Sequence, residues 1–395
     1  MEIFNKMSSS KRPTRVHVYL NNLIHNLKAA RMQIGKKPLI CMPVKADAYG
    51  HGSVEISKTA LENGASILLV AAVDEGVELR EAGIEAPILL ITQTTTEELD
   101  IAAAYQLVPF VSDKEYIAAF ASAAEKTGKK HKVFLKIDTG MGRMGCRPEE
   151  ALELARCIAS HKMLSQMGTA THFAVSDSEE ETDIEWTNHQ IKIFKNTLDS
   201  IRSAGLDPGI ASAANSGAVI SHNTTYFDMV RPGIVLYGYQ DTELKTALPV
   251  KPLMELVSQI VLIKKVHKGE TVSYGRTWTA EKDTFIGILP VGYGDGLPRL
   301  LSTKIHDSDY FFVVINGEKY PLAGRICMDQ CMINLGQSPK VKLYDTAILF
   351  GPEVPALNAA DIAGRIGTIS YEVCCNINKR VPRIYQYNSA PHKHW

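Results

Sequence analysis

Eight short apolar segments that alternate with helical patterns constrain the fold of this chain more than any other feature. Each apolar segment is short enough to be a buried strand, and the segments between them carry apolar residues at helical spacing. Parallel strands need a crossover between them, usually a helix, so this alternation indicates an α/β fold. The predicted strands are Leu39–Val44, Ile67–Ala72, Ile88–Ile91, Leu107–Val111, Val133–Ile137, Gly168–His172, Ile210–Ala213 and Phe227–Val230.

Two architectures fit such a pattern. A doubly wound sheet that binds dinucleotides carries a G-x-G-x-x-G turn after its first strand, and none follows here. Eight continuous repeats instead favour an N-terminal (β/α)8 TIM barrel. A lead strand, Val16–Leu20, precedes the first helix, and the later predicted helices include Val54–Asn63, Asp74–Ala82, Lys114–Thr127, Pro148–His161 and Glu185–Ala204.

The pattern changes near Lys251, where short strands with Gly-rich turns predict a separate, mainly β domain. The dipeptide Asn316-Gly317 between two apolar runs predicts a tight hairpin turn. We therefore expect a flexible leader over residues 1–14, the barrel over 15–250 and a C-terminal mainly-β domain over 251–395. The predicted strands of this domain are Val257–Val266, Thr271–Tyr274, Phe285–Val291, Phe311–Asn316, Lys319–Ala323, Cys331–Leu335 and Thr346–Phe350.

Charge and composition exclude several classes of partner. Lys+Arg and Asp+Glu both number 43 in the 395 residues, so a general nucleic-acid or anionic-membrane surface is not expected. No apolar run approaches the roughly 20 residues of a membrane helix, and the polar N-terminus has no secretory pattern. The seven cysteines form no CxxC and have no histidine nearby at ligand spacing, so we expect no metal site and reduced thiols in the cytoplasm.

Polar residues suited to catalysis follow several of the predicted barrel strands, where barrel enzymes place their working groups. Lys45 follows the first strand, and a lysine that is partly desolvated there can form a Schiff base. An ordinary surface lysine before a Gly-rich turn is the alternative. Ser216 and the backbone N–H groups of Gly233 and Ile234 follow the last two strands, which commonly hold a phosphate. A Schiff-base lysine with a phosphate seat indicates a site for pyridoxal 5′-phosphate (PLP).

The motifs at these positions, together with others in the β domain, resemble those of alanine racemases, fold-type III PLP enzymes. The resemblance covers nearly the whole chain in order, and its departures are Asp47 where asparagine is frequent, the pair Cys374-Cys375 and a slightly longer N-terminus. The matching motifs are Val44–Gly52, Lys136–Gly145, Thr171–Ala174, Ala214–Ser216, Met229–Gly233, Val272–Gly275, Gly292–Gly296, Gly324–Gln330, Thr368–Glu372 and Arg380–Tyr385.

The resemblance implies a reaction and its catalytic groups. Family members interconvert L-alanine and D-alanine, and Lys45 would hold PLP and act as one of two bases. Tyr274 would be the second base, because racemisation needs one group to remove the α-proton and another to deliver one to the opposite face. His172 would assist Tyr274, and Arg231 would contact His172 and face the pyridine nitrogen without giving up a proton.

The resemblance also implies binding residues. Arg143 would reach the PLP phenolic oxygen and the substrate carboxylate, which Met328 would also bind through its backbone. Lys136 matches a lysine that is carbamylated in many family members, with an ordinary barrel lysine as the alternative, and Asp329 matches a supporting residue that approaches from the partner subunit. The implied cofactor-binding residues are Lys45, Tyr49, Asn215, Ser216, Arg231, Gly233, Ile234 and Tyr371.

The family further implies a homodimer with shared active sites, in which the β domain of one chain covers the barrel of the other. The expected role is the supply of D-alanine for bacterial peptidoglycan. A broad-specificity amino-acid racemase on the same fold remains an alternative, compatible with Asp47 and the Ala213–Ser216 stretch. A non-catalytic PLP carrier is another, although such carriers lack the domain that contains Tyr274.

Overall fold

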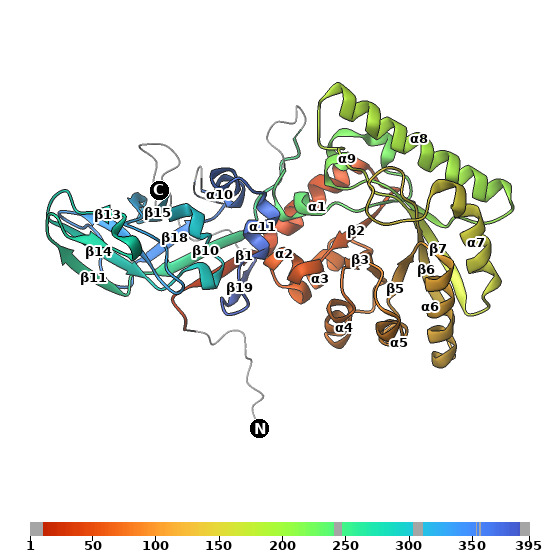
Figure 1. Cartoon of the computed structure of the whole chain (residues 1–395), viewed down its shortest axis with the longest axis horizontal. Coiled ribbons are helices and arrows are strands. Elements are labelled where there is room, and N and C mark those ends of the chain that lie inside the picture. Colours follow the sequence, from red (N-terminus) through yellow and green to blue (C-terminus); the bar gives the residue numbers. More distant parts are fainter. Residues whose placement is uncertain (1–10, 241–246, 303–310, 353, 355–356, 388–395) are drawn as a thin grey trace. The chain divides into compact units, whose positions relative to one another are not determined.

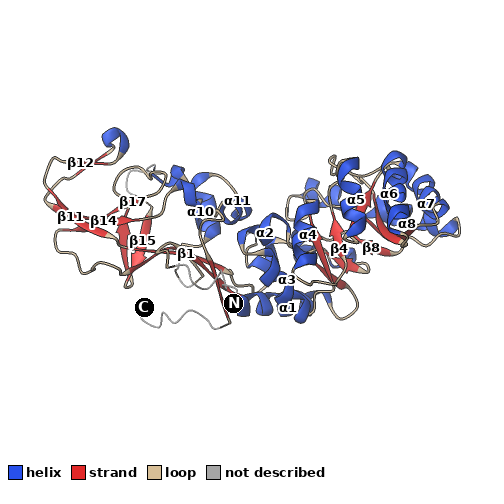
Figure 2. Ribbon diagram, turned by 90° about the horizontal axis from the view of Figure 1, so that it is seen from below, coloured by secondary structure: helices blue, strands red, loops and turns tan. Residues whose placement is uncertain are grey.

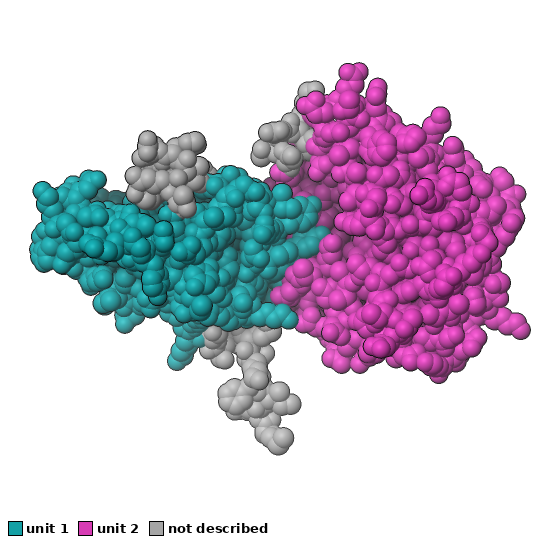
Figure 3. All heavy atoms as spheres, in the orientation of Figure 1, with its two compact units in different colours: residues 1–22, 49–52, 251–395 teal, residues 23–48, 53–250 magenta. Residues whose placement is uncertain are grey.

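The computed structural model describes residues 11–240, 247–302, 311–352, 354 and 357–387. The chain forms two compact units, coloured separately in Figure 3. Unit 1 comprises Met1–Asn22, Tyr49–Gly52 and Lys251–Trp395, and unit 2 comprises Leu23–Ala48 and Ser53–Val250. The short segment Tyr49–Gly52, a few residues after Lys45, thus belongs to unit 1, whereas the residues on both sides of it belong to unit 2.

Unit 2 is a closed parallel barrel, which confirms the predicted fold and all eight of its strands. The last strand pairs with the first through Leu39↔Met229 and Ile40↔Val230, and this pairing closes the ring. The barrel strands are β2 (Leu39–Pro43), β3 (Ile67–Val70), β4 (Ile88–Leu90), β5 (Val108–Val111), β6 (His131–Lys136), β7 (Leu164–Ala170), β8 (Ile210–Ser212) and β9 (Met229–Val230).

The barrel interior is filled by side chains from its own strands. Phe110 of β5 and Phe134 of β6 stack with ring centroids 5.4 Å apart, and both are fully buried. Around them lie Cys41, Ile67, Leu69, Leu89, Val108, Ala170 and Met229, so every strand except β8 contributes a fully buried member to this cluster. Polar chemistry is therefore confined to the strand ends and the residues beyond them.

Helices surround the barrel strands, as Figures 1 and 2 show. Their ends follow local capping rules: Asp113 accepts the Tyr116 N–H at the start of α6, and Gly128 ends that helix at φ 66°. No helix within the described residues is long and apolar enough to cross a membrane. Helix α1 (Leu20–Ile34) begins in unit 1, and α2 (Lys45–Gly50) begins in unit 2 and ends in unit 1. The other helices of unit 2 are α3 (Ser53–Glu62), α4 (Val73–Glu81), α5 (Thr96–Ala104), α6 (Lys114–Thr127), η1 (Pro148–Glu150), α7 (Ala151–Ser160), α8 (Glu181–Ser203), α9 (Ser216–Ser221), η2 (Asn223–Thr225) and η3 (Ile234–Tyr237).

Unit 1 is mainly β, as predicted for the C-terminal part of the chain. Its strands form a six-stranded sheet in the order β16-β15-β18-β10-β1-β19, a three-stranded sheet β11-β14-β17 and a ribbon β12-β13. The strands are β1 (Arg15–Tyr19), β10 (Met254–Gln259), β11 (Leu262–Val266), β12 (Thr271–Val272), β13 (Trp278–Thr279), β14 (Thr284–Leu289), β15 (Phe312–Ile315), β16 (Glu318–Pro321), β17 (Cys331–Gly336), β18 (Thr346–Phe350) and β19 (Arg383–Gln386). The helices are η4 (Tyr274–Arg276), η5 (Tyr293–Asp295), η6 (Arg299–Ser302), α10 (Ala359–Ile366) and α11 (Ser370–Cys375).

Three local predictions for this unit can be compared with the structure. The Asn316-Gly317 turn is confirmed, with both residues at positive φ between the paired strands β15 and β16. The prediction of one strand over Val257–Val266 is wrong, because β10 and β11 belong to different sheets and an apolar run does not reveal where a chain changes sheet. The predicted strand Thr271–Tyr274 ends at Val272, since Ser273 at φ 70° turns the chain into η4.

The N-terminal segment also differs from the prediction. The barrel was expected to start at residue 15, but β1 pairs antiparallel with β10 and parallel with β19 because the barrel is already closed without it. Residues 1–10 of the predicted flexible leader lie outside the described residues. The described end of that leader is bound: Thr14 is buried, with its hydroxyl 2.9 Å from Ser258 Oγ and 2.7 Å from the Pro290 carbonyl oxygen.

Candidate active site

Lys45 begins a left-handed helical turn directly beyond the end of β2. The four residues after it have φ between 51° and 54°, and Gly50 ends the turn at φ 78°. Left-handed helical backbone costs a non-glycine residue about 1–2 kcal/mol, so a run of four is rare. The turn sends the chain from the barrel strand toward α3 within a few residues and leaves Lys45 half-buried at the barrel rim.

Glu75, at the start of α4, holds this turn in place. One carboxylate oxygen accepts the Ala46 N–H at 2.6 Å, and the other accepts those of Ala71 and Ala72 at 2.8 and 3.1 Å. A single side chain thus ties the residue after Lys45 to the loop after β3. No sequence motif marks Glu75, because its partners are backbone groups that only the fold brings together.

Asp47, where the family frequently has asparagine, has a structural partner. Its Oδ1 accepts the Ser53 N–H at 2.9 Å, at the start of α3. An asparagine oxygen could accept the same bond, so this departure from the family pattern preserves the turn.

Arg231 is buried beyond the end of β9 and contacts the loops after two neighbouring strands. Its Nη2 donates to the carbonyls of Thr171 and Ala213 at 2.6 and 3.2 Å, and its Nη1 donates to Ser212 Oγ. The same Nη2 lies 3.5 Å from Nδ1 of His172. Burial lowers the pKa of Arg231 to about 10, which leaves it charged at neutral pH.

His172 is held neutral by its surroundings. Burial lowers its pKa well below the usual range, and the positive charges of Arg231 and Lys136 lower it further. A neutral imidazole can accept a proton or a hydrogen bond, which a charged one cannot. The structure thus brings together the His172 and Arg231 pair that the sequence analysis expected.

Lys136, the last residue of β6, is 5% exposed among other cations. Its pKa is lowered to about 7, and burial is the largest cause. The positive charges of Arg231 and Arg143 also lower this pKa, and the carboxylate of Asp138 raises it. Its Nζ donates to the Ile137 carbonyl at 3.3 Å. At neutral pH a large fraction of this amine is therefore unprotonated and nucleophilic.

The loop after β6 is organised by Asp138. Its Oδ1 accepts the N–H groups of Gly140, Met141 and Gly142 at 2.9, 2.9 and 3.1 Å. Burial would raise the pKa of Asp138, but these bonds lower it below its usual value. The loop carries Arg143, whose side chain is exposed.

Ser216 links the loops after β8 and β9. Its Oγ accepts the N–H of Gly233 at 2.9 Å and that of Val235 at 3.4 Å. Because both contacts use the oxygen as acceptor, the hydroxyl proton can be donated to an anion. Asn215 caps α9 through the Ala218 N–H at 3.0 Å, and Ile234 is the first residue of η3, where N–H groups have no helical partner.

Gln190 of α8 is a buried residue that the sequence analysis missed. Its Nε2 donates to Thr139 Oγ1 at 3.2 Å and to the His172 carbonyl at 3.1 Å, while its Oε1 accepts the Ala174 N–H at 3.1 Å. It joins the loops after β6 and β7 and so fixes the backbone of His172. A buried glutamine on a long helix gives no sequence signal of this kind.

The remaining predicted residues lie in unit 1. Tyr49 and Tyr371 face each other with ring centroids 5.5 Å apart, and burial raises the pKa of Tyr49, so its hydroxyl keeps its proton. Tyr274 opens η4 and is 71% exposed, and Met328 is 54% exposed in the turn before β17. Asp329 follows Met328 and accepts Nη2 of Arg380 at 2.9 Å.

The described residues contain no group of three or more His, Cys, Asp or Glu side chains arranged to hold a metal ion. The class of protein that the fold and these residues define is a (β/α)8-barrel enzyme with an appended β domain and a cationic rim. Family models described as "Alanine racemase, N-terminal domain" and "Alanine racemase, C-terminal domain" match residues 18–241 and 253–385.

Individual relatives agree with the family models. The chain is 48% identical to the alanine racemase of Treponema denticola, covering 95% of this chain and 98% of that one, and 40% identical to that of Treponema pallidum, covering 93% and 98%. Among solved structures, alanine racemase from Clostridium difficile superimposes with a TM-score of 0.89 at 34% identity, covering 95% of this chain and 96% of that one. The Bacillus anthracis alanine racemase with bound L-Ala-P has a TM-score of 0.88 at 32% identity, covering 96% and 97%. The chain belongs to the alanine racemase family of PLP-dependent isomerases and is an enzyme of that class.

The left-handed turn leads to a stability prediction. Ala46 is exposed at φ 52°, so Ala46→Gly relieves about 1–2 kcal/mol of strain against an entropic cost of about 0.5–1 kcal/mol. We expect the free energy of unfolding to stay equal or rise by up to about 1.5 kcal/mol in urea denaturation. The matched control, Ala118→Gly at an exposed position inside the right-handed α6, should lose about 0.5–1 kcal/mol. Equal losses in both variants would show that the turn is not left-handed in solution.

Proposed function

We propose that this chain interconverts L-alanine and D-alanine with PLP bound at the carboxyl-end rim of its barrel. The observation that carries the proposal is the pairing of β2 with β9 through Leu39↔Met229 and Ile40↔Val230. Parallel neighbours end on the same rim, so the amine of Lys45 and the loop of Arg231 and Gly233 share one side of the barrel.

The residues on this rim fit PLP. A cofactor aldehyde needs a primary amine, which Lys45 offers, and a phosphate needs donors, which the Ser216 hydroxyl and the N–H of Ile234 offer. Tyr49 and Tyr371 would add phenolic donors to the phosphate, Asn215 would hold α9 in place, and the buried Arg231 would face the ring nitrogen. When bound, PLP supplies the electron sink that makes the α-proton of an amino acid removable.

Two groups of this chain would move the α-proton. The amine of Lys45 would serve one face of the α-carbon, and the phenol of Tyr274 would serve the other. To act as a base, the phenol of Tyr274 needs a partner that accepts its hydrogen bond and orients it. The neutral imidazole of His172, which Arg231 contacts, can accept a hydrogen bond of this kind.

The substrate carboxylate would be bound by cationic and backbone donors. Arg143 is exposed and positively charged on the loop after β6, and the Met328 amide lies in an exposed turn. Both would bind a carboxylate by charge-assisted hydrogen bonds. Asp329, next to Met328, would support this turn.

The exposure of Tyr274 and Met328 supports a homodimer. Catalysis that excludes water requires these side chains to be covered, and a second copy of the chain would cover them. Each active site would then combine Lys45 of one protomer with the partner's Tyr274.

The cellular role follows from the product. We propose that the enzyme supplies D-alanine for peptidoglycan in the cytoplasm. The seven cysteines all lie among the described residues and form no disulfide with one another, which supports a reducing compartment.

A racemisation assay tests the activity. Purified protein with PLP should convert L-alanine to D-alanine, with much lower rates on other L-amino acids, as measured by chiral chromatography. Lys45→Ala should reduce the rate by at least about 10²–10⁴-fold. Comparable rates over a broad panel would favour the broad-specificity racemase, and no racemisation of any amino acid would contradict the proposal.

A second prediction concerns Lys136. We propose that its neutral amine adds CO2 to form a carbamate and releases a proton, since an anion between Arg231 and Arg143 is favoured over another cation. After incubation with ¹³C-bicarbonate, a carbamate signal should appear by ¹³C NMR and disappear in Lys136→Ala. It should persist in the control Lys132→Ala, an exposed lysine of the same strand. Loss of the signal in the control, or its persistence in Lys136→Ala, would refute the assignment.

The shared active site makes a third prediction. Lys45→Ala and Tyr274→Phe chains should each be inactive, and mixing them should restore about a quarter of the wild-type rate per chain, because half of the dimers have one intact site. Mixing Lys45→Ala with a Lys45→Ala/Tyr274→Phe double variant should restore nothing. If verified subunit exchange gives no recovery in the first mixture, both bases come from one chain.

A further inference from the structure

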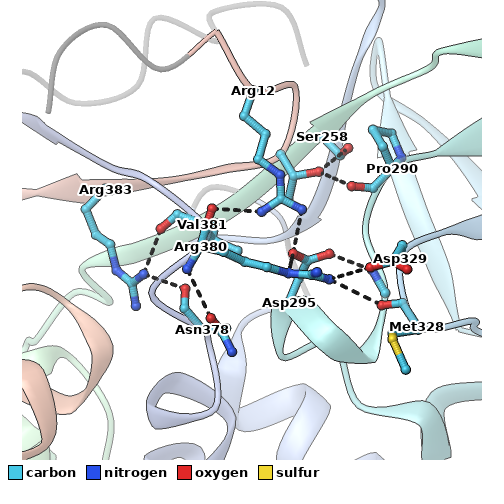
Figure 4. Close-up of polar contacts among 12 residues, drawn as sticks. Arg12, Ser258, Pro290, Asp295, Met328, Asp329, Asn378, Arg380, Val381 and Arg383 are labelled. Atoms are coloured by element: carbon cyan, nitrogen blue, oxygen red, sulfur yellow. Dashed lines mark hydrogen bonds and ion pairs between the residues drawn. The ribbon is translucent and has the colours of Figure 1, made fainter. Parts of the chain in front are cut away.

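Asp295 is a completely buried carboxylate held between two arginines of distant chain segments (Figure 4). Its Oδ1 accepts Nη2 of Arg12 at 2.5 Å and Nε of Arg380 at 2.7 Å, while its Oδ2 accepts the Gly292 N–H at 3.0 Å. Arg12 also donates through Nη1 to the Arg380 carbonyl at 2.9 Å. A buried charge is stable only when it is paired in this way.

Arg380 extends this network to a second carboxylate. Its Nη2 donates to Asp329 Oδ1 at 2.9 Å and lies 3.5 Å from the Met328 carbonyl oxygen. The planar guanidinium therefore bridges Asp295 and Asp329 with donors that point in fixed directions (Figure 4). A lysine ammonium is a single point and cannot span both carboxylates in this geometry.

The turn that contains Met328 is fixed from the same side by the loop of η5. The Cys327 carbonyl accepts the Tyr293 N–H at 3.1 Å, and the Met328 carbonyl accepts the Gly294 N–H at 2.9 Å. A Cβ at Gly292 would lie 2.2 Å from the Cys327 oxygen, so the two segments are in direct backbone contact. These bonds hold the peptide between Cys327 and Met328 in one orientation.

That orientation decides where the Met328 N–H points. In a planar trans peptide the C=O and the following N–H point in opposite directions. Because the Cys327 carbonyl faces the η5 loop, the Met328 N–H faces away from it, toward the exposed side of the turn. A donor fixed in this way is pre-organised to receive a carboxylate.

We propose that Arg380, held by Asp295 and Arg12, is a positioning residue that directs the Met328 amide at the substrate carboxylate. The inference rests on the proposed function, because it takes Met328 as a carboxylate donor. Arg380 acts through the turn and does not touch the substrate. Arg12 is the outer brace, which gives the N-terminal segment a part in substrate binding.

Kinetics of Arg380→Lys test the role. With the turn loosened, the KM for alanine should rise about tenfold while kcat changes less than about twofold, the pattern of lost ground-state binding. Inhibition by acetate, a carboxylate without an amine, should weaken by a similar factor, and affinity for PLP should not change. Arg365→Lys on α10, outside this network, is the matched control and should leave all three values unchanged.

Several outcomes would overturn the inference. If the wild type racemises alanine and Arg380→Lys keeps its KM and acetate inhibition, the proposed function stands and the positioning role fails. A fall in kcat with unchanged KM would also exclude it. If Arg380→Lys does not fold, as judged by circular dichroism, Arg12→Ala is the variant to test, because Asp295 then keeps Arg380 as its partner. Acetate inhibition of Arg12→Ala should weaken about two- to threefold. No change in that inhibition would refute the positioning role.

Discussion

The closure of the barrel by β2 and β9 is the constraint on which the active site depends. Only Leu39↔Met229 and Ile40↔Val230 join these strands, yet they bring residues almost two hundred positions apart onto one rim. The interior below the rim is apolar and closely filled, so it offers no alternative place for charged groups. Lys45 and Arg231 therefore lie at the same end of the barrel because the ring closes, independently of any attraction between them.

The electrostatics of this rim differ from those of the whole chain. The chain has no net charge, but Lys45, Lys136, Arg143 and Arg231 all lie at or beyond the ends of barrel strands. The nearby carboxylate of Asp138 is engaged by three backbone N–H groups. The consequence is a local excess of positive charge that favours anionic ligands. Burial is the main cause that lowers the pKa of Lys136 and His172, and this positive charge lowers it further. A phosphate and an amino-acid carboxylate are anions of the required kind.

Side-chain contacts hold two turns of this protein in fixed conformations, and one of these turns has strained backbone. The left-handed turn after Lys45 places four non-glycine residues at positive φ. Glu75 accepts the Ala46 N–H at the start of this turn, and Asp47 accepts the Ser53 N–H just after it. In unit 1 the turn of Met328 is likewise held by Asp295 and Arg380. In both places side chains fix a backbone segment that the proposed chemistry needs, and in the left-handed turn they maintain a conformation that is costly for non-glycine residues.

The sequence by itself determined the barrel, its eight strands, the Asn316-Gly317 hairpin and most of the rim residues, because periodicity and turn chemistry are local properties. The family resemblance added the roles of Lys45 and Tyr274, which no spacing rule supplies. Only the tertiary structure decided that β1 joins the six-stranded sheet, that β10 and β11 separate, and that Arg12 reaches Asp295, 283 residues away. It also decided the pKa of Lys136, since desolvation and charge depend on neighbours in space. The left-handed turn is the limiting case: its sequence, Ala46-Asp47-Ala48-Tyr49, has no glycine until Gly50, and the surrounding contacts overcome the local preference of the backbone for right-handed φ.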